Sequence, residues 1–381
     1  MTDLLRDTLR EQAETETPPR FDVEQIMRDG DARAGRARIG TGLVAAGIAG
    51  VVALGGVALS QMGAEDGRDL QVADQRDARP AFAERRVTYA AGSVIHYGVD
   101  SIDVGQKVVS FVQTDDGFVF VTPDGSVHLA DSSAREIGRT DAEAAYLKSD
   151  DSGSLVAWVE FATGERPTLV VFDTAARDEV LRTSDGTTPD MTAFRDSHAA
   201  FVYAVDDGTV YWRTVDGMVA VDVETGESEL VLPGARGFDV LDVAAGQFAY
   251  MTGDGERMQV GADPTKPGAR MPWGWDGDLS PDARFVTSDQ ADKAAVFDAR
   301  TGEDVTPRAP GYEFRSFYSW LDESRVAMIA IEDAGGGQGL VDLLECSVVD
   351  GTCTVAQDDA VEFADDAESV DLTLPVGERM F

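Results

Sequence analysis

Carboxylates are the commonest side chains in this sequence that can take part in acid–base chemistry. The chain of 381 residues contains 70 Asp and Glu residues against 32 Lys and Arg residues, which gives a formal net charge of −38. A glycoside hydrolase needs two carboxylates roughly 5 to 10 Å apart across the bond that it cleaves. Because acids occur throughout the chain, their spacing singles out no such pair, and this function is a less favoured alternative.

Other catalytic signatures are absent from the sequence. There is no G-x-S-x-G motif, and three scattered histidines, His96, His128 and His198, give no support for a catalytic triad. Neither a G-x-x-x-x-G-K-[ST] loop nor an EF-hand ligand spacing occurs. The sequence therefore predicts a non-enzymatic protein without a cofactor or metal. Its negative charge would repel phosphates, so we expect no binding to nucleic acid.

Two further patterns are candidates for a ligand site. The segment 149–153, Ser-Asp-Asp-Ser-Gly, is similar to the start of the sialidase Asp-box, but the aromatic residue that should follow is replaced by Leu155-Val156. Trp273, Trp275 and Trp320 could line a binding surface. Aromatic side chains in strands more often belong to the core, and the Asp-box is itself a turn-stabilising element. Neither pattern predicts an activity.

The two cysteines, Cys346 and Cys353, flank an Asp350-Gly351 pair that is typical of a tight turn between two strands. Their sulfur atoms would then lie opposite each other across a hairpin. In an oxidising compartment we expect them to form a disulfide; the alternative is two free thiols.

Residues 39–62 contain no charged side chain. Twenty-four helical residues extend about 36 Å, which is enough to cross a hydrocarbon core of about 30 Å. Arg33, Arg36 and Arg38 precede this segment, and the first charges after it are Glu65 and Asp66. By the positive-inside rule, the N-terminus is cytoplasmic and the remainder lies outside the cell membrane. A cleaved secretory signal is the alternative, but the acidic leader of 38 residues matches a signal peptide poorly.

These features divide the chain into four parts. Residues 1–38 form a cytoplasmic arm with two short helices, 39–62 a single transmembrane helix, 63–85 a polar linker and 86–381 an extracytoplasmic domain. The helices of the arm are too short to be stable alone in water. The arm is therefore either a flexible tail or a docking element for a cytosolic partner.

The large domain repeats a polar turn followed by a short apolar strand. Six such starts are separated by 36, 44, 49, 37 and 41 residues, a period typical of the four-stranded blades of β-propellers. A second pattern, a strand followed by a turn with glycine, recurs at Gly226 and Gly302. The six starts are Gly117, Gly153, Ser197, Gly246, Ala283 and Ser324.

Residues 279–286, Leu-Ser-Pro-Asp-Ala-Arg-Phe-Val, resemble the strand-opening motif of WD40-like and TolB-like propellers, with Ala283 where that motif usually has Gly. The chain is similar to a divergent member of this broad group over about residues 87–375, and the resemblance implies an all-β propeller. We expect seven blades, with six as the alternative. A hairpin of residues 94–97 and 101–104 would pair with 369–374 and close the ring, which removes free strand edges.

The sequence thus predicts a membrane-anchored extracytoplasmic β-propeller that acts as a non-enzymatic binding, scaffolding or sensory domain for an envelope protein or a glycan. The alternative is a transmembrane regulator that signals through the cytoplasmic arm, in the manner of an anti-sigma factor. The His-x-x-x-Cys-x-x-Cys signature of many anti-sigma domains is absent. Propellers serve many functions, so the fold alone cannot choose between these roles.

Overall fold

Short apolar strands that reverse at polar turns make up the described fold. The computed structural model describes residues 82–378 except 132, 144, 162–164, 192–198, 235–238, 252–256, 273, 275–276, 291–292, 333–337 and 365–371. Every regular element in these residues is a β-strand, as the alternating pattern predicts. The two recurring turns and the described starts therefore belong to an all-β domain.

Backbone hydrogen bonds group the strands into seven antiparallel sheets. In chain order, the sheets contain β1 (Thr88–Ala91), β2 (Val94–Tyr97) and β3 (Asp100–Asp103); β4 (Ser110–Thr114), β5 (Gly117–Val121), β6 (Ser126–Ala130) and β7 (Ala134–Arg139); β8 (Lys148–Ser149), β9 (Leu155–Glu160), β10 (Thr168–Asp173) and β11 (Asp178–Thr183); β12 (Val202–Asp206), β13 (Thr209–Thr214), β14 (Gly217–Asp222) and β15 (Ser228–Pro233); β16 (Asp239–Ala244), β17 (Gln247–Met251), β18 (Met258–Gly261) and β19 (Ala269–Arg270); β20 (Phe285–Gln290) and β21 (Lys293–Asp298); and β22 (Phe314–Trp320), β23 (Arg325–Ile331), β24 (Gln338–Ser347) and β25 (Thr352–Ala364).

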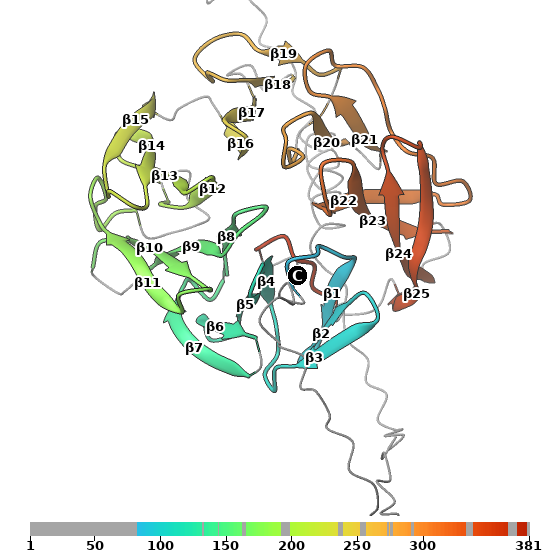
Figure 1. Ribbon diagram of the computed structural model, residues 1–381, viewed down its shortest axis with the longest axis horizontal. Coiled ribbons are helices and arrows are strands. Elements are labelled where there is room, and N and C mark those ends of the chain that lie inside the picture. Colours follow the sequence, from blue (N-terminus) through green and yellow to red (C-terminus); the bar gives the residue numbers. More distant parts are fainter. Residues whose placement is uncertain are drawn as a thin grey trace, which may run out of the picture. The chain divides into compact units, whose positions relative to one another are not determined.

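The sheets follow one another around a ring, with the first strand of each four-stranded sheet nearest the centre (Figure 1). This arrangement is a β-propeller. Six blades follow in sequence from β4 to β25. The sheet of β20 and β21 is extended by single bridges from Leu279 to Val286 and from Phe297 to Asp304. The three-stranded sheet β1–β3 lies where the two ends of the domain meet (Figure 1).

The predicted repeat matches the blades at five of its six starts. Four of them open or shortly precede the second strand of a blade. The fifth, Ala283, precedes β20, which is joined to Leu279 on its other side by a single bridge. The third start, Ser197, is outside the described residues and precedes β12, the first strand of its blade. The equivalent turn is Asp207-Gly208, between β12 and β13. The long connection between β11 and β12 contains another segment whose sequence resembles such a turn, and the prediction chose that segment.

Backbone torsions agree with the two recurring turns. Gly226 and Gly302 have φ of 71° and 73°, a region that glycine enters without steric cost. Ala283 has φ of 52°, so the alanine occupies a left-handed conformation that is uncommon for residues other than glycine.

The core lies between the blades. One cluster joins apolar side chains of β5 and β6 to Trp158 of β9 and Val170 of β10, all of them almost completely buried. Faces of neighbouring sheets thus pack against each other, as in other stacked sheets. Burying each large apolar side chain contributes roughly 1.5 to 3 kcal/mol. This packing fixes the positions of the inner strands around the ring.

The C-terminal segment crosses the inner strands of three sheets. Ala90 of β1 and Thr373 exchange two backbone hydrogen bonds of 2.8 and 2.9 Å. Further on, Gly377 donates its N–H to the carbonyl of Phe111 on β4, and its carbonyl accepts a hydrogen bond from the N–H of Leu147 beside β8. The predicted hairpin at 94–104 is present, but β1 rather than this hairpin pairs with the C-terminal segment.

The expected transmembrane segment 39–62 and the arginines Arg33, Arg36 and Arg38 lie outside the described residues. In the part of the chain that the structure describes, no helix is long and apolar enough to span a bilayer. The chain divides into two units, Met1–Gly42 and Leu43–Phe381, and all described residues belong to the second.

Candidate functional site

Charged side chains from several blades gather around the centre of the ring. β8 and β16 and the turn after β12 contribute them, together with the segment before β1, the segment before β20 and the end of the C-terminal segment. We call this group the central cluster. Its members are Arg85, Lys148, Asp150, Asp151, Asp206, Asp207, Asp242, Asp278 and Glu378.

Lys148 is the cation of the central cluster that interacts with Asp242, Asp278 and Glu378. Its Nζ lies 5.6 Å from the ring centroid of Tyr146, which is also on the approach to β8. Burial would lower the pKa of Lys148, but the interactions with Tyr146 and with the carboxylates of Asp278 and Asp242 raise it above its ordinary value. The charge of Glu378 acts in the same direction. Lys148 therefore remains protonated at neutral pH.

Asp242 joins two blades. Its Oδ2 accepts a hydrogen bond of 2.8 Å from the backbone N–H of Leu279, next to Asp278. Burial, together with the nearby charge of Asp278, raises the pKa of Asp242 to about 7, although Lys148 and this hydrogen bond oppose the shift. Asp242 is therefore partly protonated near neutral pH.

Two neighbouring acids occupy the turn between β8 and β9. Burial is the main cause that raises the pKa of Asp150 to about 6, with a further contribution from Asp206. Burial and the charge of Asp242 raise the pKa of Asp151 well above its usual range. Arg85 counteracts both shifts, and its Nε donates a hydrogen bond of 3.3 Å to the carbonyl of Asp151.

The turns that carry these acids are themselves tied to their neighbours. The carboxylate of Asp206 accepts hydrogen bonds of 3.0 and 2.9 Å from the N–H groups of Ala245 and Gly246 in the next blade. Arg85 also lies 3.4 Å from the carboxylate of Asp115 in the turn after β4. The central cluster is therefore held by contacts between different blades rather than by one local motif.

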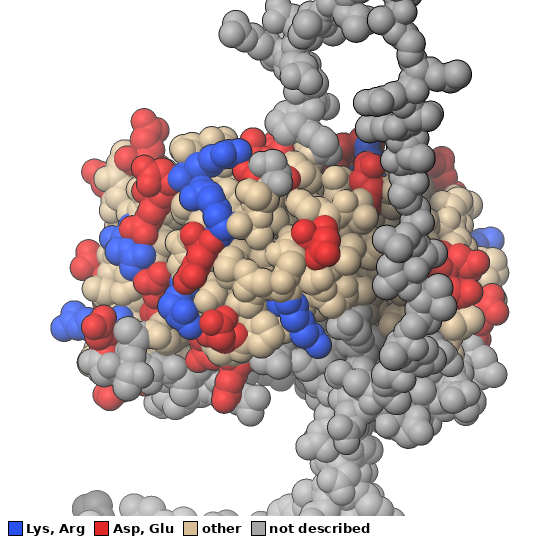
Figure 2. Space-filling view, turned by 90° about the horizontal axis from the view of Figure 1, so that it is seen from below, with Lys and Arg blue, Asp and Glu red and all other residues tan. Residues whose placement is uncertain are grey.

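The arrangement can attract positive charge and can hold protons near neutral pH. Seven carboxylates stand against two cations among the named members of the cluster. Like charges in a partly buried place raise one another's pKa and favour a cationic group that would neutralise them. On one outer side of the propeller, by contrast, basic side chains lie among the acidic ones (Figure 2).

Sequence reasoning found only one part of the central cluster. It singled out the Asp150-Asp151 turn through its similarity to the Asp-box, and Asp150 does accept the N–H of Ser152 in that turn. It missed Lys148, Asp242 and Asp278, which lie on different blades. Each of them is a charged residue in or beside an inner strand. From the strand pattern alone, such a residue cannot be distinguished from one that faces solvent.

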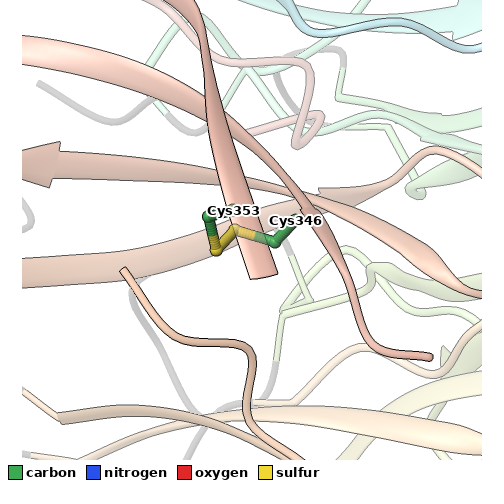
Figure 3. The surroundings of a disulfide bond; sticks show 2 residues. All are labelled: Cys346 and Cys353. Carbon is green, nitrogen blue, oxygen red and sulfur yellow. A yellow bond between two sulfur atoms is a disulfide. The ribbon is translucent and has the colours of Figure 1, made fainter. Parts of the chain in front are cut away.

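The two cysteines meet as expected for a hairpin. Cys346 of β24 and Cys353 of β25 are directly paired, and their sulfur atoms are bonded at 2.08 Å (Figure 3). Cys346 is completely buried, whereas Cys353 is half-buried. The disulfide joins two strands of the last blade and lies outside the central cluster.

The other residues considered from the sequence do not form a site among the described residues. Trp320 is buried in the core, and its Nε1 donates a hydrogen bond of 3.0 Å to the carbonyl of Asp278. His96 stacks on Tyr89, and His128 lies in a different sheet. Trp273, Trp275 and His198 lie outside the described residues.

Sequence reasoning also missed a smaller acidic group on the last blade. Carboxylate oxygens of Asp342, Asp358 and Asp359 lie within 4.8 Å of one another. Asp342 accepts hydrogen bonds from the hydroxyl of Tyr312 and from the N–H of Asp359. The signal was the Asp358-Asp359 pair, but its proximity to Asp342 depends on the bulged register of β24 and β25.

Comparisons with known proteins find only distant structural similarity. No family model and no curated protein sequence matches this chain. Among solved structures, the β-propeller domain of the Trilobed protease from Pyrococcus furiosus is 16% identical, with a TM-score of 0.46, over 70% of this chain and 90% of that chain. BamB from Moraxella catarrhalis is 15% identical, with a TM-score of 0.39, over 71% of this chain and 91% of that chain.

Proposed function

We propose that the propeller is a non-enzymatic binding or scaffolding domain whose ring centre receives a basic segment of a protein in the cell envelope. The observation that carries this proposal is the central cluster, in which carboxylates of several blades outnumber Arg85 and Lys148. An excess of negative charge attracts cationic groups and steers their approach. Contacts between the blades hold the carboxylates in place before a partner arrives.

The proposal includes a tether to the cell membrane. Residues 39–62 would form a single transmembrane helix, with 1–38 in the cytoplasm, 63–85 as linker and 86–381 outside. Three arginines before the apolar segment support this direction: Arg33, Arg36 and Arg38. The disulfide between Cys346 and Cys353 agrees with an oxidising compartment.

We also assign a seventh blade to the meeting point of the two ends of the domain. Its strands would be β1, β2 and β3, with the C-terminal segment around Thr373 as the innermost strand. The two hydrogen bonds between Ala90 and Thr373 support this assignment. Such a blade would join the ends of the ring and leave no open gap for edge pairing.

A pull-down with a charge-matched control tests the binding role. Full-length protein in detergent is used to recover partners from solubilised membranes, and the partners are quantified by mass spectrometry. D150N/D151N removes two acidic groups from the central cluster, whereas E224Q/E303Q removes two from exposed turns elsewhere. We expect D150N/D151N to reduce recovery of a basic envelope protein about fivefold or more, and E224Q/E303Q to leave it unchanged.

High salt provides a second test, because screening weakens attraction between charges. Recovery by the wild-type protein should fall as the salt concentration rises, and the D150N/D151N variant should be less sensitive. Equal recovery by both variants, or the absence of any enriched envelope protein, would contradict the proposal.

A further inference from the structure

We propose that the outer face of the last blade contains a binding site for a neutral sugar unit. This inference is independent of the role proposed for the ring centre. A pocket of about 450 Å³ opens on this face, a size that is typical of small-molecule sites. Its lining consists of Ser324, Arg325, Glu345, Ser347, Val349, Asp350, Thr352 and Thr354.

Strand register places the polar side chains of the pocket in two adjacent rows. Arg325 of β23 is paired with Ser347 of β24, which is paired with Thr352 of β25. In the neighbouring row, Glu345 is paired with Thr354. Strands lie about 4.8 Å apart, and alternate residues share one face of a sheet. The pocket therefore presents a guanidinium, a carboxylate and three hydroxyls on one nearly continuous surface.

Arg325 is oriented before any ligand binds. Its Nε donates to the Oδ2 of Asp322 at 2.6 Å, and its Nη1 donates to the Oε1 of Glu345 at 2.7 Å. A guanidinium carries five N–H groups, so N–H donors remain for a ligand after these contacts. Fixing a long side chain in advance reduces the entropy that binding would otherwise cost.

The hydroxyls of Thr352 and Thr354 make no hydrogen bond with any described residue, although both line the pocket. Ser347, by contrast, donates its hydroxyl to Asp350 at 2.8 Å and accepts the N–H of Asp350 at 3.1 Å. This contact stabilises the turn at one end of the pocket. The two threonines are the groups that remain available for a ligand.

The disulfide stiffens the floor of the pocket. Cys346 and Cys353 stand between the two rows in the register, so their side chains lie on the opposite face of the sheet. Their bond joins β24 and β25 (Figure 3), on the face of the sheet opposite the pocket. A rigid hairpin keeps the hydroxyls of the two strands at a fixed separation.

The charged and polar groups in and beside the pocket indicate the class of ligand. The carboxylates of Asp322, Glu345 and Asp350 outnumber the guanidinium of Arg325, which disfavours an anion. The guanidinium disfavours a simple cation at the same place. Sugar hydroxyls both donate and accept hydrogen bonds, and they can therefore match carboxylate, guanidinium and hydroxyl groups together. Val349, with 68% of its surface exposed, offers an apolar contact for the C–H groups of a sugar ring.

Titration with defined probes tests the site. The neutral probes are maltose, cellobiose and N,N′-diacetylchitobiose; sialic acid is the anionic probe and trilysine the cationic peptide probe. Binding to the full-length protein in detergent is measured by calorimetry. We expect at least one neutral disaccharide to bind, and T352V/T354V to weaken that binding about tenfold or more because two hydroxyls are lost.

The control is T209V, which makes the same change on β13, in another blade. It should leave the affinity within about twofold of the wild-type value. If T352V/T354V does not fold, as judged by thermal melting, T354V alone replaces it with an expected loss of about threefold or more. Binding of none of the neutral sugars, preferential binding of sialic acid or trilysine, or unchanged affinity in the folded threonine variant would overturn the proposal.

Discussion

Substitution of Gly377 by alanine tests whether the C-terminal segment holds the inner strands together. Gly377 has φ of 72°, and a Cβ atom added there would lie 2.1 Å from the carbonyl oxygen of Leu147 and 2.9 Å from the Cγ1 of Val112. Gly226 provides a matched control, because its φ is 71° and nothing lies within 4 Å of an added Cβ. Both variants place alanine in a left-handed backbone conformation, but only G377A brings the new Cβ atom into close contact with neighbouring atoms.

The magnitudes follow from these contacts. Alanine in a left-handed conformation costs about 1 kcal/mol relative to glycine, so G226A should lower the free energy of unfolding by about that amount. In G377A the segment must also move away from the Leu147 carbonyl. That movement lengthens the hydrogen bonds of Gly377 to Leu147 and Phe111, each of which contributes about 1 kcal/mol. We therefore expect G377A to be destabilised by about 3 kcal/mol.

The assay is urea denaturation of the full-length protein in detergent, followed by tryptophan fluorescence. Midpoints and slopes are compared among wild type, G226A and G377A, because the free energy of unfolding falls linearly with urea. Equal destabilisation by G226A and G377A would refute the reasoning, since it would mean that the contact with Leu147 does not constrain the ring.

Three further predictions concern titration and the disulfide. His128 is buried beside Phe120, neither of its ring nitrogens is hydrogen-bonded to a described residue, and burial lowers its pKa. The free energy of unfolding should therefore fall as pH drops below about 6.5, and it should fall less in H128L, as measured by urea midpoints. The pKa of Asp242 is raised to about 7, so its effect on stability has the opposite pH dependence: it favours the fold at low pH, and this contribution is lost as pH rises from about 4 to 7. D242N should reduce that loss and have the higher urea midpoint at pH 8. Reduction of Cys346–Cys353 should lower the free energy of unfolding by about 2.5 kcal/mol, and C346A/C353A should not respond to reductant; identical midpoints with and without reductant in the wild type would contradict this.

The strand pattern was sufficient to predict most of the local structure. The apolar runs at 118–121 and 285–286 are strands, and the glycine turns at Gly226 and Gly302 have the positive φ that the sequence implies. The Asp350-Gly351 turn brings Cys346 opposite Cys353. These features depend on contacts between residues close in sequence, so turn chemistry and alternation are enough to find them.

The same reasoning failed where an equivalent position had to be chosen among similar segments. Ser197 looked like the third blade start, but the chain makes another turn at Asp207-Gly208 before the second strand of that blade. It also assigned ring closure to the 94–104 hairpin, whereas the C-terminal segment pairs with Ala90. The first error is a choice between two similar turn sequences on either side of β12. The second concerns pairing over a long distance in the chain, which local patterns do not specify.

The sequence by itself determined the class of the fold, its repeat and the cysteine hairpin, because these follow from alternation and turns within a few residues. Only the tertiary structure decided that Lys148, Asp242 and Asp278 belong to one cluster, and that Arg325 shares a surface with Thr352 and Thr354. These residues are brought together by the order of blades around the ring and by the register between strands. Both depend on packing between whole sheets, which no single segment encodes.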